Sequence, residues 1–131
     1  LALFLAHNPQ EIAETDILAT YTRQAVEYIN CRYSYPITVD DIAAYVGVSR
    51  SHLYRAFRAV LKQSPKTYLS RFRIKQACVL LAQQDLSVAS IAQSVGYENG
   101  LYFSKVFHRI KGKTPTDYAR EAREKARRGG K

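Results

Sequence analysis

Basic side chains are the groups in this 131-residue sequence whose type and spacing could do chemistry. Between Arg50 and Lys75 the chain carries eight Lys and Arg residues and no Asp or Glu. Cations at this density bind the phosphates of nucleic acid, and the formal net charge of +9 favours the same partner. An anionic membrane surface ranks second, because the apolar stripes are narrow and divided among several short helices, unlike those of an interfacial helix.

Catalytic and metal-binding chemistry is not indicated. His7, His52 and His108 do not stand at metal-ligand spacing with Cys, Asp or Glu, and no motif of a metalloprotease, serine hydrolase or nucleotide-binding loop occurs. Cys31 and Cys78 lack the partners of a zinc site or a disulfide framework, and both are interpreted as reduced core thiols. We therefore expect a protein that is not an enzyme and that uses no metal and no cofactor.

Helices must position the basic residues, because alternating strand patterns and Asn-Gly or Asp-Gly hairpin turns are missing. The sequence predicts an all-α fold. A first amphipathic helix is expected from about Asp16 to Asn30, with Thr15 or Asp16 as its N-cap. Its expected inward positions are Ile17, Leu18, Tyr21, Ala25, Tyr28 and Ile29.

A helix-turn-helix pattern follows Pro36. Thr38 is expected to cap a short helix, with Asp41 as the acidic member of a capping box, and Gly47 is expected to end it. Ser49 is expected to cap the next helix, which runs to about Leu61. Its inward stripe is Leu53, Phe57, Val60 and Leu61, and outside that stripe lie Arg50, Ser51, Tyr54, Arg55 and Arg58. A short helix, a Gly turn and a second helix have the spacing of a helix-turn-helix.

The same pattern occurs a second time. At an offset of 49 residues, Val39, Ile42, Ala43, Val46 and Gly47 meet Val88, Ile91, Ala92, Val95 and Gly96, and Ser87 takes the capping place of Thr38. At an offset of 50, Leu53 meets Phe103, Arg55 meets Lys105, Phe57 meets Phe107, Ser64-Pro65 meets Thr114-Pro115, and Tyr68 meets Tyr118. One small helical unit is therefore present twice.

A long helix is expected between the two units, from Pro65 to about Gln83. Its candidate packing positions are Tyr68, Leu69, Phe72, Ile74, Cys78 and Leu81. Nineteen helical residues span roughly 28 Å. The major groove of B-form DNA returns to the same face every ~34 Å, so such a spacer could hold two recognition helices in successive major grooves.

The expected organisation follows from these elements. Residues 1–14 are interpreted as a linker or as the end of an absent N-terminal domain, 15–63 as the first helix-turn-helix subdomain and 64–84 as the connecting helix. Residues 85–118 form the second subdomain, and 119–131 a basic tail that we interpret as a solvated helix end. The sequence begins with Leu1 and contains no Met, so we expect a piece of a longer protein.

Two stretches resemble the AraC/XylS family of bacterial transcription regulators. The run DIAAYVGVSRSHLYRAF from Asp41 to Phe57 is similar to the first helix-turn-helix of that family. The run SVASIAQSVGYENGLYFSKVFHRIKGKTPTDYAR from Ser87 to Arg120 is similar to the second, with its series of Ile-Ala, Val-Gly-Tyr, Tyr-Phe, Phe-x-x-x-x-Gly and Thr-Pro-x-x-Tyr. The resemblance covers about residues 15 to 120. It implies about seven helices, arranged as two homeodomain-like three-helical units joined by a long central helix.

The resemblance also implies where DNA is bound. By motif position, base readout is expected from Arg50, Ser51, Tyr54, Arg55, Asn99, Gly100, Leu101, Tyr102, Ser104 and Lys105. Arg55 is the first choice, since Arg can bond O6 and N7 of guanine together, and Leu101 could contact a thymine methyl. Phosphate contacts are expected from His52, Arg58, Lys62, His108, Arg109, Lys111 and Lys113, with Arg71, Arg73 and Lys75 in the wider pool.

The expected partner is double-stranded DNA carrying an operator or promoter, and the expected location is the bacterial cytoplasm, at the nucleoid while bound. The resemblance implies an absent N-terminal domain that binds any effector and allows a dimer, and it names RNA polymerase as a further expected partner. Two units in one chain imitate a dimer, so this chain is expected to bind as a monomer. The alternative is a basic helical module that binds nucleic acid without sequence preference, or a protein partner such as RNA polymerase.

Overall fold

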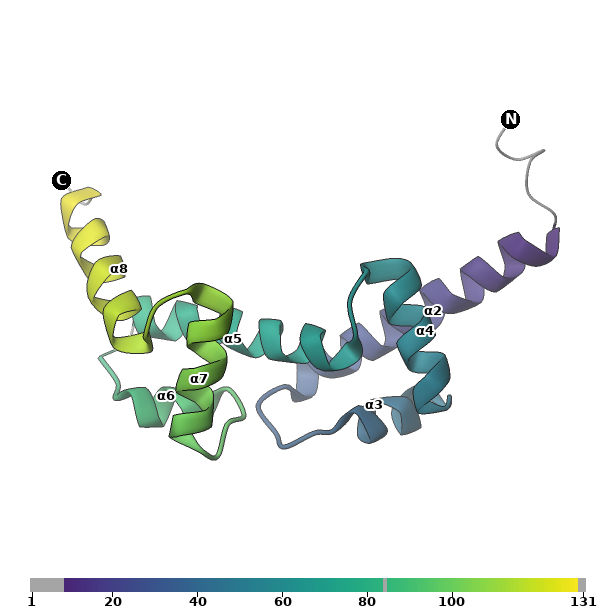
Figure 1. Ribbon diagram of the computed structural model, residues 1–131, viewed down its shortest axis with the longest axis horizontal. Coiled ribbons are helices and arrows are strands. Elements are labelled where there is room, and N and C mark those ends of the chain that lie inside the picture. The colour runs from purple at the N-terminus through teal and green to yellow at the C-terminus, as the bar shows by residue number, and fades with distance from the viewer. Residues whose placement is uncertain (1–8, 84, 130–131) are drawn as a thin grey trace. The chain divides into compact units, whose positions relative to one another are not determined.

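The computed structural model describes residues 9–83 and 85–129, and in these residues it contains seven helices and no strand (Figure 1). In chain order the helices are α2 (Pro9–Arg32), α3 (Val39–Val46), α4 (Arg50–Leu61), α5 (Pro65–Gln83), α6 (Val88–Ser94), α7 (Gly100–Lys111) and α8 (Pro115–Gly129). The all-α prediction is confirmed, and the predicted bounds of the long helix α5 agree with those observed.

The start of α2 differs from the prediction. Neither Thr15 nor Asp16 is an N-cap, because the helix begins at Pro9 and both residues lie within it. Proline is well tolerated at the first helical position, and the Gln, Glu and Ala residues that follow favour helix. The packed face of α2 also comes later than expected: Thr22, Ala25 and Ile29 are buried, whereas Ile17 is 48% exposed.

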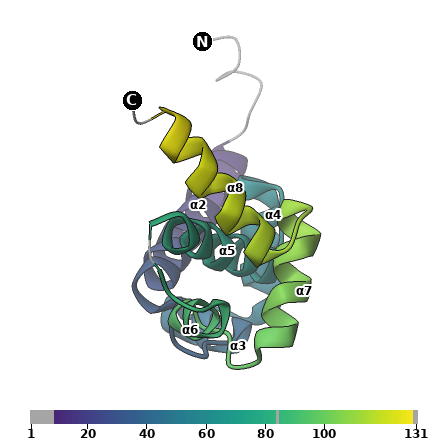
Figure 2. The ribbon, with the colours of Figure 1, turned by 90° about the vertical axis from the view of Figure 1, so that its left-hand side faces the viewer.

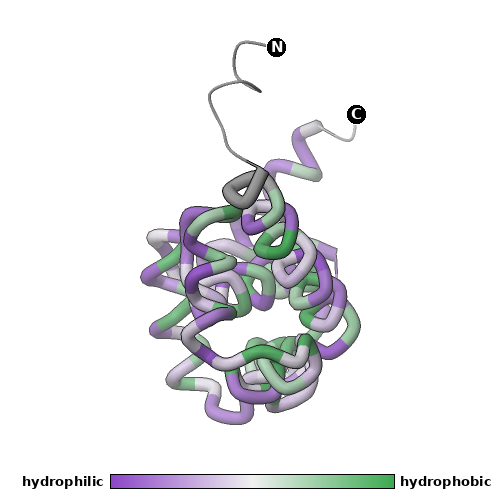
Figure 3. The backbone as a smooth tube through the Cα atoms, turned by 90° about the vertical axis from the view of Figure 1, so that its right-hand side faces the viewer, coloured by the Kyte–Doolittle hydropathy of each residue, from purple (hydrophilic) through white to green (hydrophobic). Residues whose placement is uncertain are grey.

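The described chain divides into two units. The first unit contains residues 9–31 and 37–67, and its buried apolar side chains come from α2, α3 and α4. They are Ala25, Ile29, Ile42, Ala43, Leu53, Ala56 and Phe57. Figure 3 shows the hydropathy along the tube, where hydrophobic and hydrophilic residues alternate within the helices. This is the pattern of amphipathic helices that bury one face against each other.

The helix-turn-helix of the first unit is formed as predicted. The hydroxyl of Thr38 accepts a hydrogen bond from the Asp41 backbone N–H (3.1 Å), and the Asp41 carboxylate accepts one from the Thr38 backbone N–H (2.8 Å). This reciprocal capping box fixes the start of α3. Gly47 ends the helix with φ at +87°, in the left-handed region that favours glycine. In α4, however, the expected inward residue Val60 is 40% exposed. Ala56, which was not expected to face inward, is fully buried.

The second unit contains residues 32–36, 68–83 and 85–129. Figure 2 looks onto this unit. It shows α7 along one side of the unit, and α8 leading away from the other helices. Its core brings together Ile74, Ala77, Cys78, Leu81, Ile91, Ala92, Val95, Tyr97, Phe103, Val106 and Phe107. The repeat is therefore structural: Leu53 and Phe103 are both fully buried, and so are Phe57 and Phe107.

A buried arginine holds the connection between α2 and α3 on this unit. Arg73 of α5 is 9% exposed and donates from Nε to the carbonyl oxygen of Tyr33 (2.9 Å) and from Nη2 to that of Tyr35 (2.8 Å). Its guanidinium lies 5.4 Å from the centre of the Tyr97 ring. Burial lowers the pKa of Arg73 from its ordinary value. Arg73 is thus a structural residue, and its expected place in the pool of phosphate contacts is wrong.

The glycine that precedes Tyr97 is required by the same contact. Gly96 has φ at +101°, and a Cβ at this position would lie 2.5 Å from the Tyr33 carbonyl oxygen. No other residue type fits both the conformation and the space. The Val-Gly-Tyr sequence therefore places the backbone of residue 96 directly against the connection that Arg73 holds.

Candidate nucleic-acid interface

Helix α4 presents a polar row opposite its buried side. The hydroxyl of Ser49 caps the helix by accepting a hydrogen bond from the backbone N–H of His52 (3.1 Å). Ser51, Arg55 and Arg58 are exposed and follow each other at spacings of four and three residues, so they share one face of the helix. We call them the α4 row. Tyr54 lies beside the row and is half-buried.

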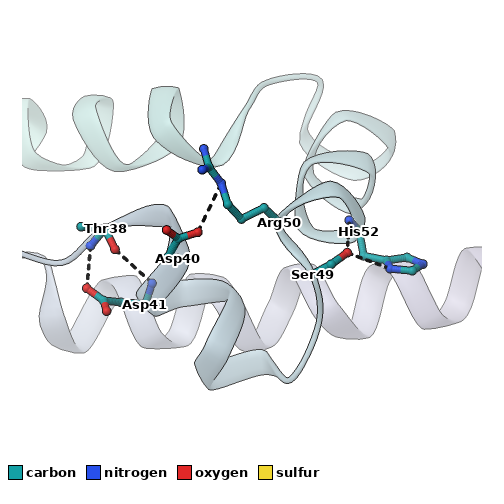
Figure 4. A network of polar contacts seen from close by, with 6 residues as sticks. All are labelled: Thr38, Asp40, Asp41, Ser49, Arg50 and His52. Carbon is teal, nitrogen blue, oxygen red and sulfur yellow. Dashed lines mark hydrogen bonds and ion pairs between the residues drawn. The ribbon is translucent and has the colours of Figure 1, made fainter.

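Two further residues expected at the start of α4 have local partners, shown in Figure 4. Arg50 turns toward α3, where its Nε lies 3.3 Å from a carboxylate oxygen of Asp40. The Nδ1 atom of His52 lies 3.1 Å from the hydroxyl of Ser49. Both side chains remain exposed, so each is accessible to a ligand in addition to its local partner.

Helix α7 presents the corresponding row fifty residues later. Leu101, Lys105 and His108 are exposed on one face, opposite the buried Phe103 and Phe107. We call them the α7 row. Leu101 is 79% exposed, and an apolar side chain presented to this extent on a basic face is suited to an apolar contact such as a thymine methyl.

The other expected readers of α7 lie around its first turn. The side-chain oxygen of Asn99 accepts hydrogen bonds from the backbone N–H groups of Leu101 (2.9 Å) and Tyr102 (3.1 Å), so this residue is the N-cap. Gly100 faces open space, and Ser104 is half-buried beside the row. The ring of Tyr102 is half exposed and leans on Tyr97, with 5.9 Å between the ring centres.

The residues expected to contact phosphates fall into two groups. Arg58, Arg109 and the histidines His52 and His108 are exposed on α4 and α7. Three lysines near the helix ends have partners within the chain. Lys62 donates to the carbonyl of Ala59 (3.2 Å), Lys111 lies 5.8 Å from the ring centre of Tyr118, and Lys113 pairs with Glu121 (2.6 Å).

One residue near the α4 row is not predictable from the sequence. A carboxylate oxygen of Glu14 on α2 lies 4.0 Å from Nη2 of Arg55, and both side chains are more than half exposed. Glu14 had been assigned to a linker, and it is 41 positions away from Arg55, so no local pattern could have connected them. The acid lies beside the side chain that is the first candidate for base readout.

Other kinds of site find no support in the described part of the chain. No group of three or more His, Cys, Asp or Glu residues there could hold a metal ion. None of the helices in residues 9–83 and 85–129 is long and apolar enough to cross a membrane. The fold contains two helix-turn-helix motifs, the arrangement typical of DNA-binding domains.

Comparison with known proteins gives the family. A family model described as a helix-turn-helix domain matches residues 42–121. The lactose operon transcription activator of Staphylococcus xylosus is 40% identical over 94 residues, which cover 72% of this chain and 34% of that protein. An AraC-type transcriptional regulator from Chromobacterium violaceum has a TM-score of 0.74 at 31% identity, covering 79% of this chain and 93% of that one. This chain belongs to the AraC-type family of helix-turn-helix DNA-binding domains.

A relative has been solved on DNA. This relative is AdpA, a global transcriptional factor. The structure of its DNA-binding domain in complex with a target DNA has a TM-score of 0.71 to this chain at 28% identity. The alignment covers 82% of this chain and 94% of that chain. The present chain aligns with only 34 to 39% of the length of the first curated relatives, which are regulators of transcription.

Proposed function

We propose that this chain reads a specific sequence of double-stranded DNA with α4 and α7, each lying in a major groove. The observation that carries the proposal is the equivalence of the two rows: Ser51, Arg55 and Arg58 on α4 correspond to Leu101, Lys105 and His108 on α7 at an offset of 50. Both rows lie opposite a buried face on a capped helix of twelve residues. Two such helices in one chain favour binding as a monomer to two half-sites about one helical turn apart.

The roles of the row residues and of the neighbouring Arg109 follow from side-chain chemistry. Arg55 is proposed to bond O6 and N7 of a guanine, and Leu101 to contact a thymine methyl. Lys105 takes the place of Arg55 on α7. Arg58 and Arg109 lie one turn farther along and are proposed to contact phosphates, which fix the helix in the groove without selecting a base.

The experiment begins with selection from a pool of random duplexes at low and at higher salt. Because phosphate contacts weaken with salt while base contacts persist, the higher-salt pool should yield a motif with two half-sites. A pool that loses binding with salt and enriches no motif would refute specific readout by this chain and favour non-specific binding.

Two substitutions in the α4 row then separate readout from phosphate binding. Arg55→Ala is expected to cost about 1 to 3 kcal/mol on the selected duplex and to relax discrimination at one base pair. Arg58→Ala is the matched control, since it removes the same side chain one turn away and should weaken all sequences alike. Equal losses for Arg55→Ala on selected and random duplexes would refute its role in readout.

The regulatory parts of the function are proposed to lie in a longer protein. We propose that its remaining length carries a domain that binds an effector and pairs two copies, and that the protein acts at promoters in contact with RNA polymerase. The support is the naming of the curated relatives as operon regulators, of which this chain corresponds to about a third. Binding of a promoter fragment with and without polymerase, using the longer protein, tests this directly.

A further inference from the structure

A groove in the second unit is not used by either row. It lies between one face of α5, the end of α7 and the first turn of α8, and its volume is about 610 Å³. We call it the α5 groove. On α5 the lining residues run from Arg71 to Gln83, which corresponds to about 18 Å of helix. The opposite bank is formed by Ile110, Lys111 and Tyr118.

The floor of the α5 groove is apolar. Ile74 and Cys78 belong to the core of the unit, and Ile110 and Tyr118 pack against that core while remaining partly exposed. Val79 is 45% exposed on the α5 side. The core therefore reaches the surface along this face of α5, where an apolar ligand could cover it.

The rim of the groove is basic. Arg71, Lys75 and Lys111 line it, and no Asp or Glu does. None of the ion pairs formed between described residues involves these three side chains. Arg71 and Lys75 are one turn apart on α5, or about 6 Å along its axis, whereas Lys111 lies on the other bank over the Tyr118 ring. The charges are thus spread along the groove and do not converge on one point.

The groove opens on a different side of the unit from the α7 row. At 100° per residue, Ile110 lies on about the opposite side of α7 from Leu101, Lys105 and His108. A duplex bound by the α7 row would therefore leave the floor of the groove uncovered. DNA would also be a poor occupant, since its phosphates offer no apolar surface to cover Ile74, Val79 and Ile110.

We propose that the α5 groove binds an acidic amphipathic helix of another protein. Apolar side chains at every third or fourth position would cover the floor, and carboxylates beside them would meet Arg71, Lys75 and Lys111. A small ligand with a single carboxylate would satisfy one of these cations and leave the others unpaired. Several carboxylates along a helix match the way the charges are distributed.

The test uses a synthetic helical peptide of about 16 residues, with Leu at every third or fourth position and Glu beside them, labelled with fluorescein. Two control peptides replace Glu by Lys or Leu by Ser. Anisotropy titration of the 131-residue chain is expected to show binding of the first peptide, and at least tenfold weaker binding of both controls. No binding of the first peptide, or equal binding of the Lys version, would overturn the proposal.

Variants locate the peptide on the protein. Arg71→Glu with Lys75→Glu should weaken peptide binding by about tenfold or more, and Val79→Asp should also weaken it, since each change is made at an exposed position. Lys125→Glu on α8 is the control, because it reverses an exposed charge outside the groove. Equal effects of the groove and control variants would overturn the proposal.

DNA binding is measured with the same variants. Val79→Asp should retain the affinity for the selected duplex, because it changes the groove and leaves both rows intact. A loss on DNA as large as that of Arg55→Ala would place the groove against DNA and overturn the proposal, while the proposed readout would stand. Circular dichroism of each variant, expected to match the parent chain, confirms that its helices are formed.

Discussion

The contact between Glu14 and Arg55 leads to a prediction about DNA affinity. Arg55 must leave the carboxylate of Glu14 to bond a guanine edge, and the two groups lie 4.0 Å apart with both side chains more than half exposed. At this distance in water, two unit charges attract by about 1 kcal/mol, and exposed pairs contribute about 0.2 to 1 kcal/mol. Glu14→Gln removes this competition, so we expect it to strengthen binding of the selected duplex by up to about fivefold.

The matched control is Glu27→Gln on the same helix. Glu27 pairs with Arg23 at 3.4 Å and is similarly exposed, so its substitution changes the net charge equally without touching Arg55. Anisotropy titrations at about 0.15 M salt, where charges beyond ~8 Å are largely screened, give the affinities of both variants. If the gain passes through Arg55, it should disappear when Glu14→Gln is combined with Arg55→Ala. Equal gains from both Gln variants, or a gain that persists without Arg55, would refute the reasoning.

Three further predictions concern the fold. Gly96→Ala should cost about 2 to 4 kcal/mol of unfolding free energy in urea titration, because its Cβ would lie 2.5 Å from a carbonyl oxygen. Gly47→Ala, with open space around it, should cost only about 1 kcal/mol. Equal losses for the two variants would contradict the close approach at Gly96. Lys62→Gly should stabilise the chain by about 0.5 to 1 kcal/mol, since Lys62 ends α4 at φ +60°, and an unchanged midpoint would contradict this conformation. With a thiol reagent near neutral pH, exposed Cys31 should react at once and buried Cys78 slowly. Burial raises the pKa of the Cys78 thiol, so its reactive thiolate forms only at higher pH. Two equally fast thiols would contradict the burial of Cys78.

Three residues differ from their predicted burial for one physical reason. Cys31 was expected in the core and is exposed, Arg73 was expected to face phosphates and is buried, and Val60 was expected inward and is 40% exposed. Composition and periodicity indicate which face of a helix is apolar on average. They do not indicate how far along that face a neighbouring element extends, and this decides the burial of residues near a helix end or at the edge of a stripe.

The local elements of the interface could be predicted from the sequence. Thr38, Ser49 and Ser87 are N-caps as expected, and the proline at the start of α5 and of α8 is the first helical residue after a capping hydroxyl. These features depend on hydrogen bonds between residues two or three positions apart, which a sequence displays directly. The outward positions of the two rows follow from the same local periodicity once α4 and α7 are placed.

The tertiary structure decided what these elements meet. The carbonyl contacts of Arg73 join residues 38 and 40 positions apart, the contact of Glu14 with Arg55 spans 41 positions, and the α5 groove needs side chains from three helices. Such contacts depend on how the helices pack, and packing is determined by the shapes of many buried side chains together. The sequence by itself determined two capped helix-turn-helix motifs with basic outer faces, because caps and periodicity are local. Which cations are buried, paired or free to bind a ligand was decided only when distant segments were brought into contact.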